Sequence, residues 1–205
     1  MPRVRNLLST SINAYDPNDK TGTQGTGPRH SVLPGDTLNY SIGYENVPTA
    51  TAPAQVVVIT DTLDANTLDV STLRLGGFTI SDTLVPVGNA LVPFTKDIDL
   101  RSTRGVILRA DAALNDNVLV VTLSSLDPTT MQPTTDALAG FLPPNANGFE
   151  GQGYVFFSIK PKAGLPLGTL INNTATIVFD DNAPIKTPTW TNVLGLQVFM
   201  PMVRR

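Results

Sequence analysis

Cysteine is absent from the 205-residue sequence, so the chain can form neither a disulfide framework nor a reactive thiolate. Histidine occurs once, at His30, and no nucleophile-elbow sequence accompanies it. Glutamate occurs only at Glu45 and Glu150, both near loops, which gives little support for the acid pair of a glycosidase. These absences predict that the protein is not an enzyme.

Charge and long apolar runs are also scarce. Charged residues make up 15% of the sequence and the net charge is −3, which excludes the basic surface that DNA or RNA binding requires. No run approaches the roughly 20 apolar residues of a membrane span. Residues 1–8 are basic but lack the apolar segment of a signal peptide. Without disulfides, an exported form must gain its stability from the core, a metal or assembly.

Proline and glycine are plentiful, with 17 and 16 residues, and they separate short runs rich in Val, Ile, Thr and Leu. That pattern is typical of an all-β protein. Turn signals about every eight to twelve residues favour an Ig-like antiparallel β-sandwich of about eight or nine strands. The expected strands are 37–46, 54–63, 73–80, 93–100, 105–110, 118–123, 154–159 and 168–179.

Three details of this sandwich follow from the pattern. Four apolar residues in a row, 56–59, predict a strand covered on both faces. The long segment 126–152 is expected to cover one end of the sandwich with Phe141 and Leu142. The ranges 154–159 and 168–179 are expected to form the last hairpin.

Four stretches of the chain occur together in a known family. They are DPNDK at 16–20, PGDTLNY at 34–40, VVVITDTL at 56–63 and ATIVFDDNAPI at 175–185. The ordered set resembles the immunoglobulin-like conserved-repeat modules of large bacterial cell-surface proteins. The resemblance implies an extracellular, non-enzymatic β-sandwich that serves as a stalk, adhesion or packing unit.

Acidic and amide side chains cluster near turns and strand ends. If the strands ending at Asp61 and Phe179 run the same way, these clusters meet at one pole of the sandwich, where calcium would find its oxygen ligands. The alternative is that the side chains form turns and cap backbone groups. The candidate Ca²⁺ ligands are Asp16, Asn18, Asp19, Asp61, Asp64, Asp180, Asp181 and Asn182.

Two further chemistries are considered. A glycan-binding or adhesion module would use exposed aromatic rings, and Trp190 and Tyr154 are the candidates. Modules of the related kind also contain covalent Lys–Asn cross-links, which require a buried lysine, an asparagine and a nearby acid. By this resemblance, Lys96 on an expected strand is the only plausible lysine donor.

The chain therefore divides into an N-terminal arm or first strand (1–14), the sandwich (15–190) and an apolar C-terminal arm (191–205). Either arm would pair with its own sheet edge or add a strand to a neighbouring subunit. The residues of the C-terminal assembly arm are Leu196, Val198, Phe199, Met200, Met202 and Val203. We expect a structural module of an extracellular surface protein or filament, with self-association or neighbouring modules as partners.

Overall fold

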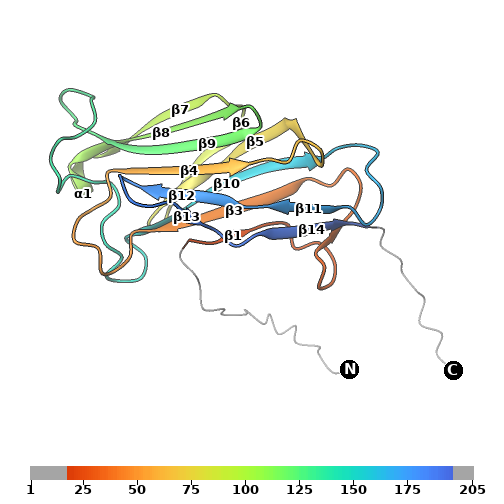
Figure 1. The fold of residues 1–205 in the computed structure, drawn as a ribbon. Coiled ribbons are helices and arrows are strands. Elements are labelled where there is room, and N and C mark those ends of the chain that lie inside the picture. The colour runs from red at the N-terminus through yellow and green to blue at the C-terminus, as the bar shows by residue number, and fades with distance from the viewer. Residues whose placement is uncertain (1–17, 196–205) are drawn as a thin grey trace, which may run out of the picture.

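The computed structural model describes residues 18–195, which form two large facing sheets and one small sheet (Figure 1). In spatial order the five-stranded sheet contains β1 (Lys20–Thr21), β3 (Leu38–Glu45), β10 (Gln152–Pro161), β5 (Leu68–Ile80) and β6 (Thr83–Ala90). The six-stranded sheet contains β13 (Ile185–Lys186), β12 (Ala175–Phe179), β4 (Val56–Thr62), β9 (Val118–Leu126), β8 (Val106–Asn115) and β7 (Phe94–Leu100).

The third sheet has three strands, β11 (Leu170–Asn173), β14 (Trp190–Leu194) and β2 (Ser31–Val32). Neighbouring strands are antiparallel except β14 and β2, which are parallel. Between residues 18 and 195 there is one short helix, α1 (Arg101–Arg104), which follows β7 and contributes no buried residue. The prediction of an all-β Ig-like sandwich is confirmed, although the described residues form fourteen strands and not the expected eight or nine. No helix among residues 18–195 is long and apolar enough to cross a membrane.

The core lies between the two large sheets and forms one continuous cluster. Alternation places Leu38, Tyr40, Ile42 and Tyr44 of β3 on the inner face. In β4, Val57 and Ile59 are buried while Val56 and Val58 are half-exposed, so this strand is covered on one face only. The expectation that 56–59 is covered on both faces is therefore wrong.

The segment between β9 and β10 covers one end of the sandwich, as predicted. Phe141 and Leu142 are fully buried, and the Leu142 carbonyl accepts a hydrogen bond from the Ala54 amide at 2.8 Å. The predicted last hairpin is wrong, because β10 pairs with β3 and β5. The expected strand 168–179 divides at Thr174 into β11 and β12, which belong to different sheets.

The last strand also differs from the expected domain limit. β14 continues to Leu194, so four residues assigned to the C-terminal arm belong to the folded sandwich. The remaining arm residues, from Leu196 to Val203, and the N-terminal range 1–14 lie outside the described residues.

Candidate functional site

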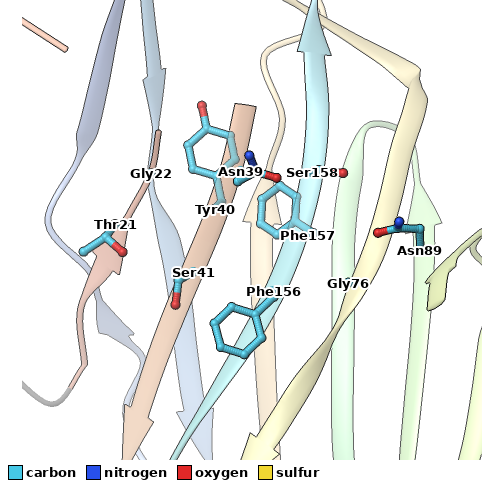
Figure 2. A pocket seen from close by; sticks show the side chains of 10 residues that line it. All are labelled: Thr21, Gly22, Asn39, Tyr40, Ser41, Gly76, Asn89, Phe156, Phe157 and Ser158. Carbon is cyan, nitrogen blue, oxygen red and sulfur yellow. The ribbon is translucent and has the colours of Figure 1, made fainter. Parts of the chain in front are cut away.

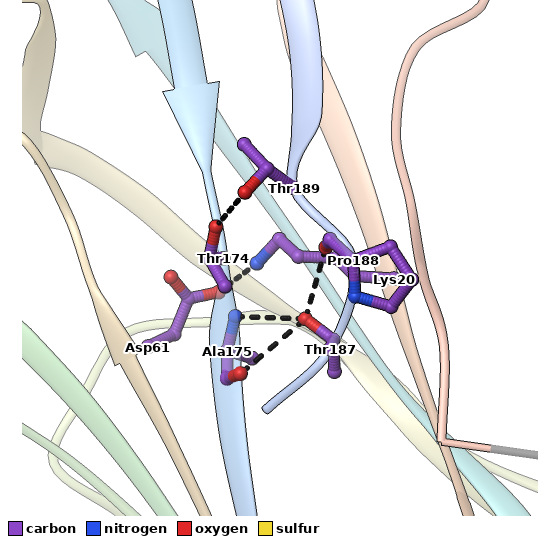
Figure 3. Close-up of polar contacts among 7 residues, drawn as sticks. All are labelled: Lys20, Asp61, Thr174, Ala175, Thr187, Pro188 and Thr189. Atoms are coloured by element: carbon purple, nitrogen blue, oxygen red, sulfur yellow. Dashed lines mark hydrogen bonds and ion pairs between the residues drawn. The ribbon is translucent and has the colours of Figure 1, made fainter. Parts of the chain in front are cut away.

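Lys20 is a lysine buried in the core. It lies in β1, at the edge of the five-stranded sheet, where its backbone pairs with Ile42. Its side chain crosses to the opposite sheet and donates a hydrogen bond to Oδ2 of Asp61 in β4. Both side chains are completely buried. Figure 3 shows the amine and the carboxyl meeting beside Thr174 and Ala175.

Asn173, at the end of β11, completes the site from a third sheet. It shares the inward face with Ile171 and Ala175, and Ala175 pairs in register with Asp61. Asn173 is 2% exposed, yet neither its side-chain oxygen nor its nitrogen has a hydrogen-bond partner. Oδ1 of Asp61 has none either. A buried amide without partners is costly, so its retention calls for an explanation.

The polypeptide around Asn173 is firmly held where β11 ends and β12 begins. The Thr187 hydroxyl accepts a hydrogen bond from the Ala175 amide, and the Thr187 amide donates a hydrogen bond to the Ala175 carbonyl, both at 3.0 Å. Thr174 and Thr189 join their hydroxyls at 2.7 Å (Figure 3). These bonds replace the strand ladder at the break between two sheets and fix the direction of the neighbouring side chains.

Two aromatic rings flank the lysine amine. Its Nζ lies 4.9 Å from the ring centroid of Tyr40 and 5.1 Å from that of Phe157. The two rings stack on each other, with centroids 5.2 Å apart. The Tyr40 hydroxyl is buried and has no hydrogen-bond partner. The rings exclude water from the site and leave Asp61 as the acceptor for the amine.

Burial controls the protonation of the pair. Desolvation lowers the pKa of Lys20, and the Asp61 charge and hydrogen bond only partly oppose it. Desolvation raises the pKa of Asp61, against the effects of Lys20 and the Asn173 amide. Both directions favour a neutral amine beside a protonated carboxyl. The site thus holds a nucleophile, a proton carrier and a carboxamide together.

The lysine predicted from the sequence is wrong. Lys96 lies on β7, an edge strand, and its side chain is exposed. Lys20 was missed because DPNDK at 16–20 resembles a turn, and no local apolar alternation marks its burial. Asn173 was not singled out within the expected strand 168–179. The signal available was a polar residue, Asn173, at an inward position of an alternating strand.

The acidic clusters do not meet at one pole. β4 and β12 are antiparallel, with Ala175 opposite Asp61 and Phe179 opposite Val57, so Asp61 and Asp180 lie at opposite ends of the strand pair. The expectation that these strands run the same way is wrong. Among residues 18–195, no group of three or more acidic or histidine side chains is placed to hold a metal ion.

Several of the predicted calcium ligands have other contacts. Asp64 accepts hydrogen bonds in its own turn from the Asn66 amide and the Thr67 hydroxyl. Asp180 accepts from the amides of Gln55 and Val56, at 2.9 and 2.8 Å. The other candidates are Asp19, bonded to the Lys20 amide; Asn18, buried; Asp181 and Asn182, exposed; and Asp16, outside the described residues. Calcium binding stays a prediction.

The aromatic candidates lie on two different surfaces. Trp190 is half-buried; its ring stacks on His30 at 4.3 Å, and its indole N–H donates to Asn192 at 3.1 Å. A Cβ at Gly22 would lie 2.5 Å from that indole ring, so the backbone also packs closely against it. Trp190 therefore packs at the edge of the core.

Tyr154 lies on the outer face of β10, stacked with Phe156 at 6.1 Å between ring centroids. Beside Phe156 is a groove with a volume of 340 Å³, which Figure 2 shows from close by. Its polar lining residues are Thr21, Asn39, Ser41, Asn89 and Ser158. The bulge at Gly76, where the register of β5 shifts, leaves one wall without a side chain.

The fold and the buried cluster define an all-β sandwich module with a lysine, an aspartate and an asparagine buried together in its core. The chain belongs to the family described as "Domain of unknown function (DUF7619)", which matches residues 16–105 and 139–193. A comparison with curated proteins gives no match. The narrower motif group inferred from the sequence stays a prediction.

Solved structures with a similar fold include two bacterial pilins and a bacterial adhesin. BcpA, the major pilin subunit of Bacillus cereus, is 17% identical with a TM-score of 0.48; the match covers 86% of this chain and 39% of that one. Domains D2 and D3 of the major pilin SpaD of Corynebacterium diphtheriae are 16% identical with a TM-score of 0.45, and the match covers 84% of this chain and 50% of that one. The collagen-binding domain of a Staphylococcus aureus adhesin is 12% identical with a TM-score of 0.43, and the match covers 90% of this chain and 100% of that one.

Proposed function

We propose that this domain is a structural module of an extracellular surface protein that strengthens itself with an amide bond between Lys20 and Asn173. The observation that carries the proposal is the buried Lys20 amine, bonded to Asp61, in a site with the unpartnered Asn173 carboxamide. Because the chain has no cysteine, such a bond would supply the covalent reinforcement that disulfides give other exported proteins.

The reaction is an acyl transfer that needs no co-reactant. The lone pair of the neutral Lys20 amine attacks Cγ of Asn173, and the bond from Nζ to Cγ forms. The bond from Cγ to Nδ2 then breaks, and Nδ2 leaves as ammonia after gaining the proton that the amine gives up. The products are one amide and one ammonia, with no oxidation or reduction.

Asp61 is the proton carrier in this scheme. Its Oδ2 accepts the hydrogen bond from the amine, and its Oδ1 has no hydrogen-bond partner. Burial raises the pKa of Asp61, and the Asn173 amide acts in the opposite direction. A protonated carboxyl can give its proton to the leaving nitrogen and take one from the attacking amine, so that Asp61 ends the reaction in the form in which it began. The reaction occurs once per chain, so the module is not an enzyme with turnover.

The first test is the intact mass of the purified full chain under denaturing conditions. The wild type is expected to be lighter than its sequence mass by one ammonia, and a protease digest should contain a branched peptide joining Lys20 to Asn173. Lys20→Met and Asn173→Ala should both restore the full sequence mass.

Lys96→Met is the matched control, because it removes an exposed lysine and leaves the core unchanged. It should keep the ammonia loss. A wild type with the full sequence mass would overturn the proposal, as would a branched peptide through a different lysine.

Assembly into a filament is the finer part of this proposal. β7 supports it, because this seven-residue strand lies at one edge of the six-stranded sheet and pairs on one side with β8. Addition of the C-terminal arm (Leu196 to Val203) to such an edge in a neighbouring copy would be strand donation. Electron microscopy of the chain with and without residues 196–205 tests it; fibres that persist after truncation contradict it.

A glycan-binding module is the second candidate, favoured by the groove beside Phe156. Within residues 18–195, the side chains of Asn39, Ser41, Asn89 and Ser158 make no hydrogen bond to protein, so they are available to sugar hydroxyls. Calorimetry with neutral oligosaccharides should detect binding that Phe156→Ala removes and Phe149→Ala, at an exposed residue outside the groove, preserves. Absence of binding by the wild type contradicts this candidate.

A further inference from the structure

Tyr40 carries a buried hydroxyl that the fold does not satisfy. Its side chain is 2% exposed, and its oxygen has no hydrogen-bond partner. Tyr44, four residues further along β3 on the same face, is also buried, yet its hydroxyl donates to the Thr79 carbonyl at 2.8 Å. The fold can thus pair a core tyrosine, and the exception is the tyrosine at the lysine site. A buried hydroxyl without a partner destabilises the folded state.

The neighbours of Tyr40 are the reacting groups themselves. Its ring centroid lies 4.9 Å from Nζ of Lys20, and its ring stacks on Phe157. Burial raises the pKa of Tyr40 far above its ordinary value, the Asp61 charge raises it further, and the nearby Asn173 amide opposes both effects. The hydroxyl therefore stays protonated at any working pH and is a permanent donor beside an amide that lacks one.

We infer that the Tyr40 hydroxyl donates a hydrogen bond to Oδ1 of Asn173 during the addition step of the cross-linking reaction. This inference rests on the proposed function. When the amine attacks Cγ, the electron pair of the carbonyl moves onto Oδ1, which becomes negative. A fixed donor stabilises that charge and is worth more in a dry site than in water.

The proton of Tyr40 is not transferred in this scheme. The electron pair returns from Oδ1 to re-form the carbonyl as the bond to Nδ2 breaks, and Asp61 moves the proton that ammonia needs. Tyr40 and Asp61 thus have separate tasks: one stabilises the oxygen and the other carries the proton.

The rate of cross-linking in newly made full-length protein measures this role. A short pulse of cell-free synthesis, followed by acid quenching at intervals, gives the fraction of chains that have lost ammonia by intact mass. Tyr40→Phe keeps the ring and removes only the hydroxyl. We expect a rate about 100-fold lower, the effect of deleting one oxyanion donor. Tyr44→Phe is the matched control and should leave the rate unchanged.

A second readout separates this role from a structural one. In an Asn173→Ala background, which cannot cross-link, Tyr40→Phe should leave the free energy of unfolding unchanged or increase it, because the variant removes an unsatisfied hydroxyl. A slower reaction with equal or higher stability supports the inference.

Equal rates for wild type and Tyr40→Phe overturn the role of Tyr40 and leave the proposed function standing. A slower reaction accompanied by lower stability in the Asn173→Ala background also overturns it, since misplacement of the site would then explain the rate. A wild type that never loses ammonia overturns the proposed function and this inference together.

Discussion

Lys20 and Asp61 show at the scale of single residues how burial selects chemistry. A buried ion pair gains little net stability over a well-packed apolar pair, because both charges lose their hydration. Here the desolvation of each group favours its neutral form. In the proposed reaction the neutral Lys20 amine is the nucleophile and the protonated Asp61 carboxyl is the acid. Conversion of the amine to an amide would remove an ionisable group from the core permanently.

Asp61→Ala provides the first prediction. The variant should keep the full sequence mass, because no group remains to move the proton, and it leaves the Lys20 amine without its hydrogen-bond acceptor. In an Asn173→Ala background, in which neither protein can cross-link, we expect Asp61→Ala to lower the free energy of unfolding by about 3–5 kcal/mol, the usual cost of breaking a buried pair. Urea unfolding and intact mass measure both effects.

The control is Asp97→Ala, which breaks the partly exposed pair of Asp97 with Arg109. Exposed pairs contribute about 0–1 kcal/mol, so this variant should unfold close to the wild type and retain the ammonia loss. Equal losses for the two variants would contradict the special role of Asp61.

Asp64 carries the second prediction, on pH. The hydrogen bond from the Asn66 backbone amide is the main cause that lowers the pKa of Asp64 below its ordinary value of 3.8, and side-chain hydrogen bonds from Thr67 and Asn66 lower it further. A carboxyl whose pKa is lower in the folded state than in the unfolded state stabilises the fold at any pH above its unfolded-state pKa. This contribution is lost as the pH falls through its folded-state pKa. Asp64→Ala should therefore cost roughly 0.5 kcal/mol near pH 7, since the group is exposed, and progressively less in acid.

Denaturant unfolding of wild type and Asp64→Ala at a series of pH values checks this prediction. The comparison is Asp181→Ala, which removes an exposed carboxyl and should change the free energy of unfolding little. A wild-type advantage at Asp64 that grows in acid would show the wrong sign and refute the assignment.

At the scale of elements, the sequence allowed prediction of strands whose apolar alternation ends at clear turns. β3, β4, β7 and the β8–β9 hairpin fall where expected. β6 was missed, because Pro86 and Gly88 interrupt its pattern. The strand 168–179 was predicted as one piece since its alternation runs unbroken through Thr174, while the change of hydrogen-bonding partners there depends on strands distant in sequence.

The same physical reason explains how much of the site could be predicted. The need for a buried lysine, an asparagine and an acid was stated from the family resemblance, but the lysine was wrong. Lys20, Asp61 and Asn173 come from three different sheets, and only the pairing of distant strands brings them together. Alternation tells which face a side chain occupies and not which strand lies opposite.

The third prediction concerns β10, the central strand of the five-stranded sheet. A Cβ at Gly153 would lie 2.3 Å from the Tyr44 hydroxyl and 2.4 Å from the Thr79 carbonyl oxygen, so Gly153→Ala must separate β10 from β5. We expect a loss of about 1–3 kcal/mol, the usual cost of overpacking a core. Thermal or urea unfolding in the Asn173→Ala background measures it without the cross-link.

Gly76→Ala is the matched control in the neighbouring strand. Its Cβ would be 3.5 Å from the nearest atoms of Phe156, an ordinary contact, so its effect should be small. A Gly153→Ala variant as stable as Gly76→Ala would mean that β10 and β5 are farther apart than described.

At the scale of the whole molecule, the cross-link would join the beginning and the end of the sandwich. Lys20 lies in the first described strand, and Asn173 follows nearly all the others. A covalent loop of this size reduces the entropy of the unfolded chain and, by the chain-entropy model, adds about 5 kcal/mol of stability. A pull on the two ends of the module would pass through the amide bond and bypass most strands.

Chemical cleavage of the unfolded chain tests this loop directly. Asn147-Gly148 is the only Asn-Gly pair in the sequence, and hydroxylamine cleaves such bonds under denaturing conditions. Because the cut lies between Lys20 and Asn173, the two pieces of the wild type should stay joined and appear as one species by denaturing mass spectrometry. Cleaved Asn173→Ala should separate into two fragments, and Lys96→Met should behave like the wild type. Separation of the wild-type fragments would disprove the covalent loop.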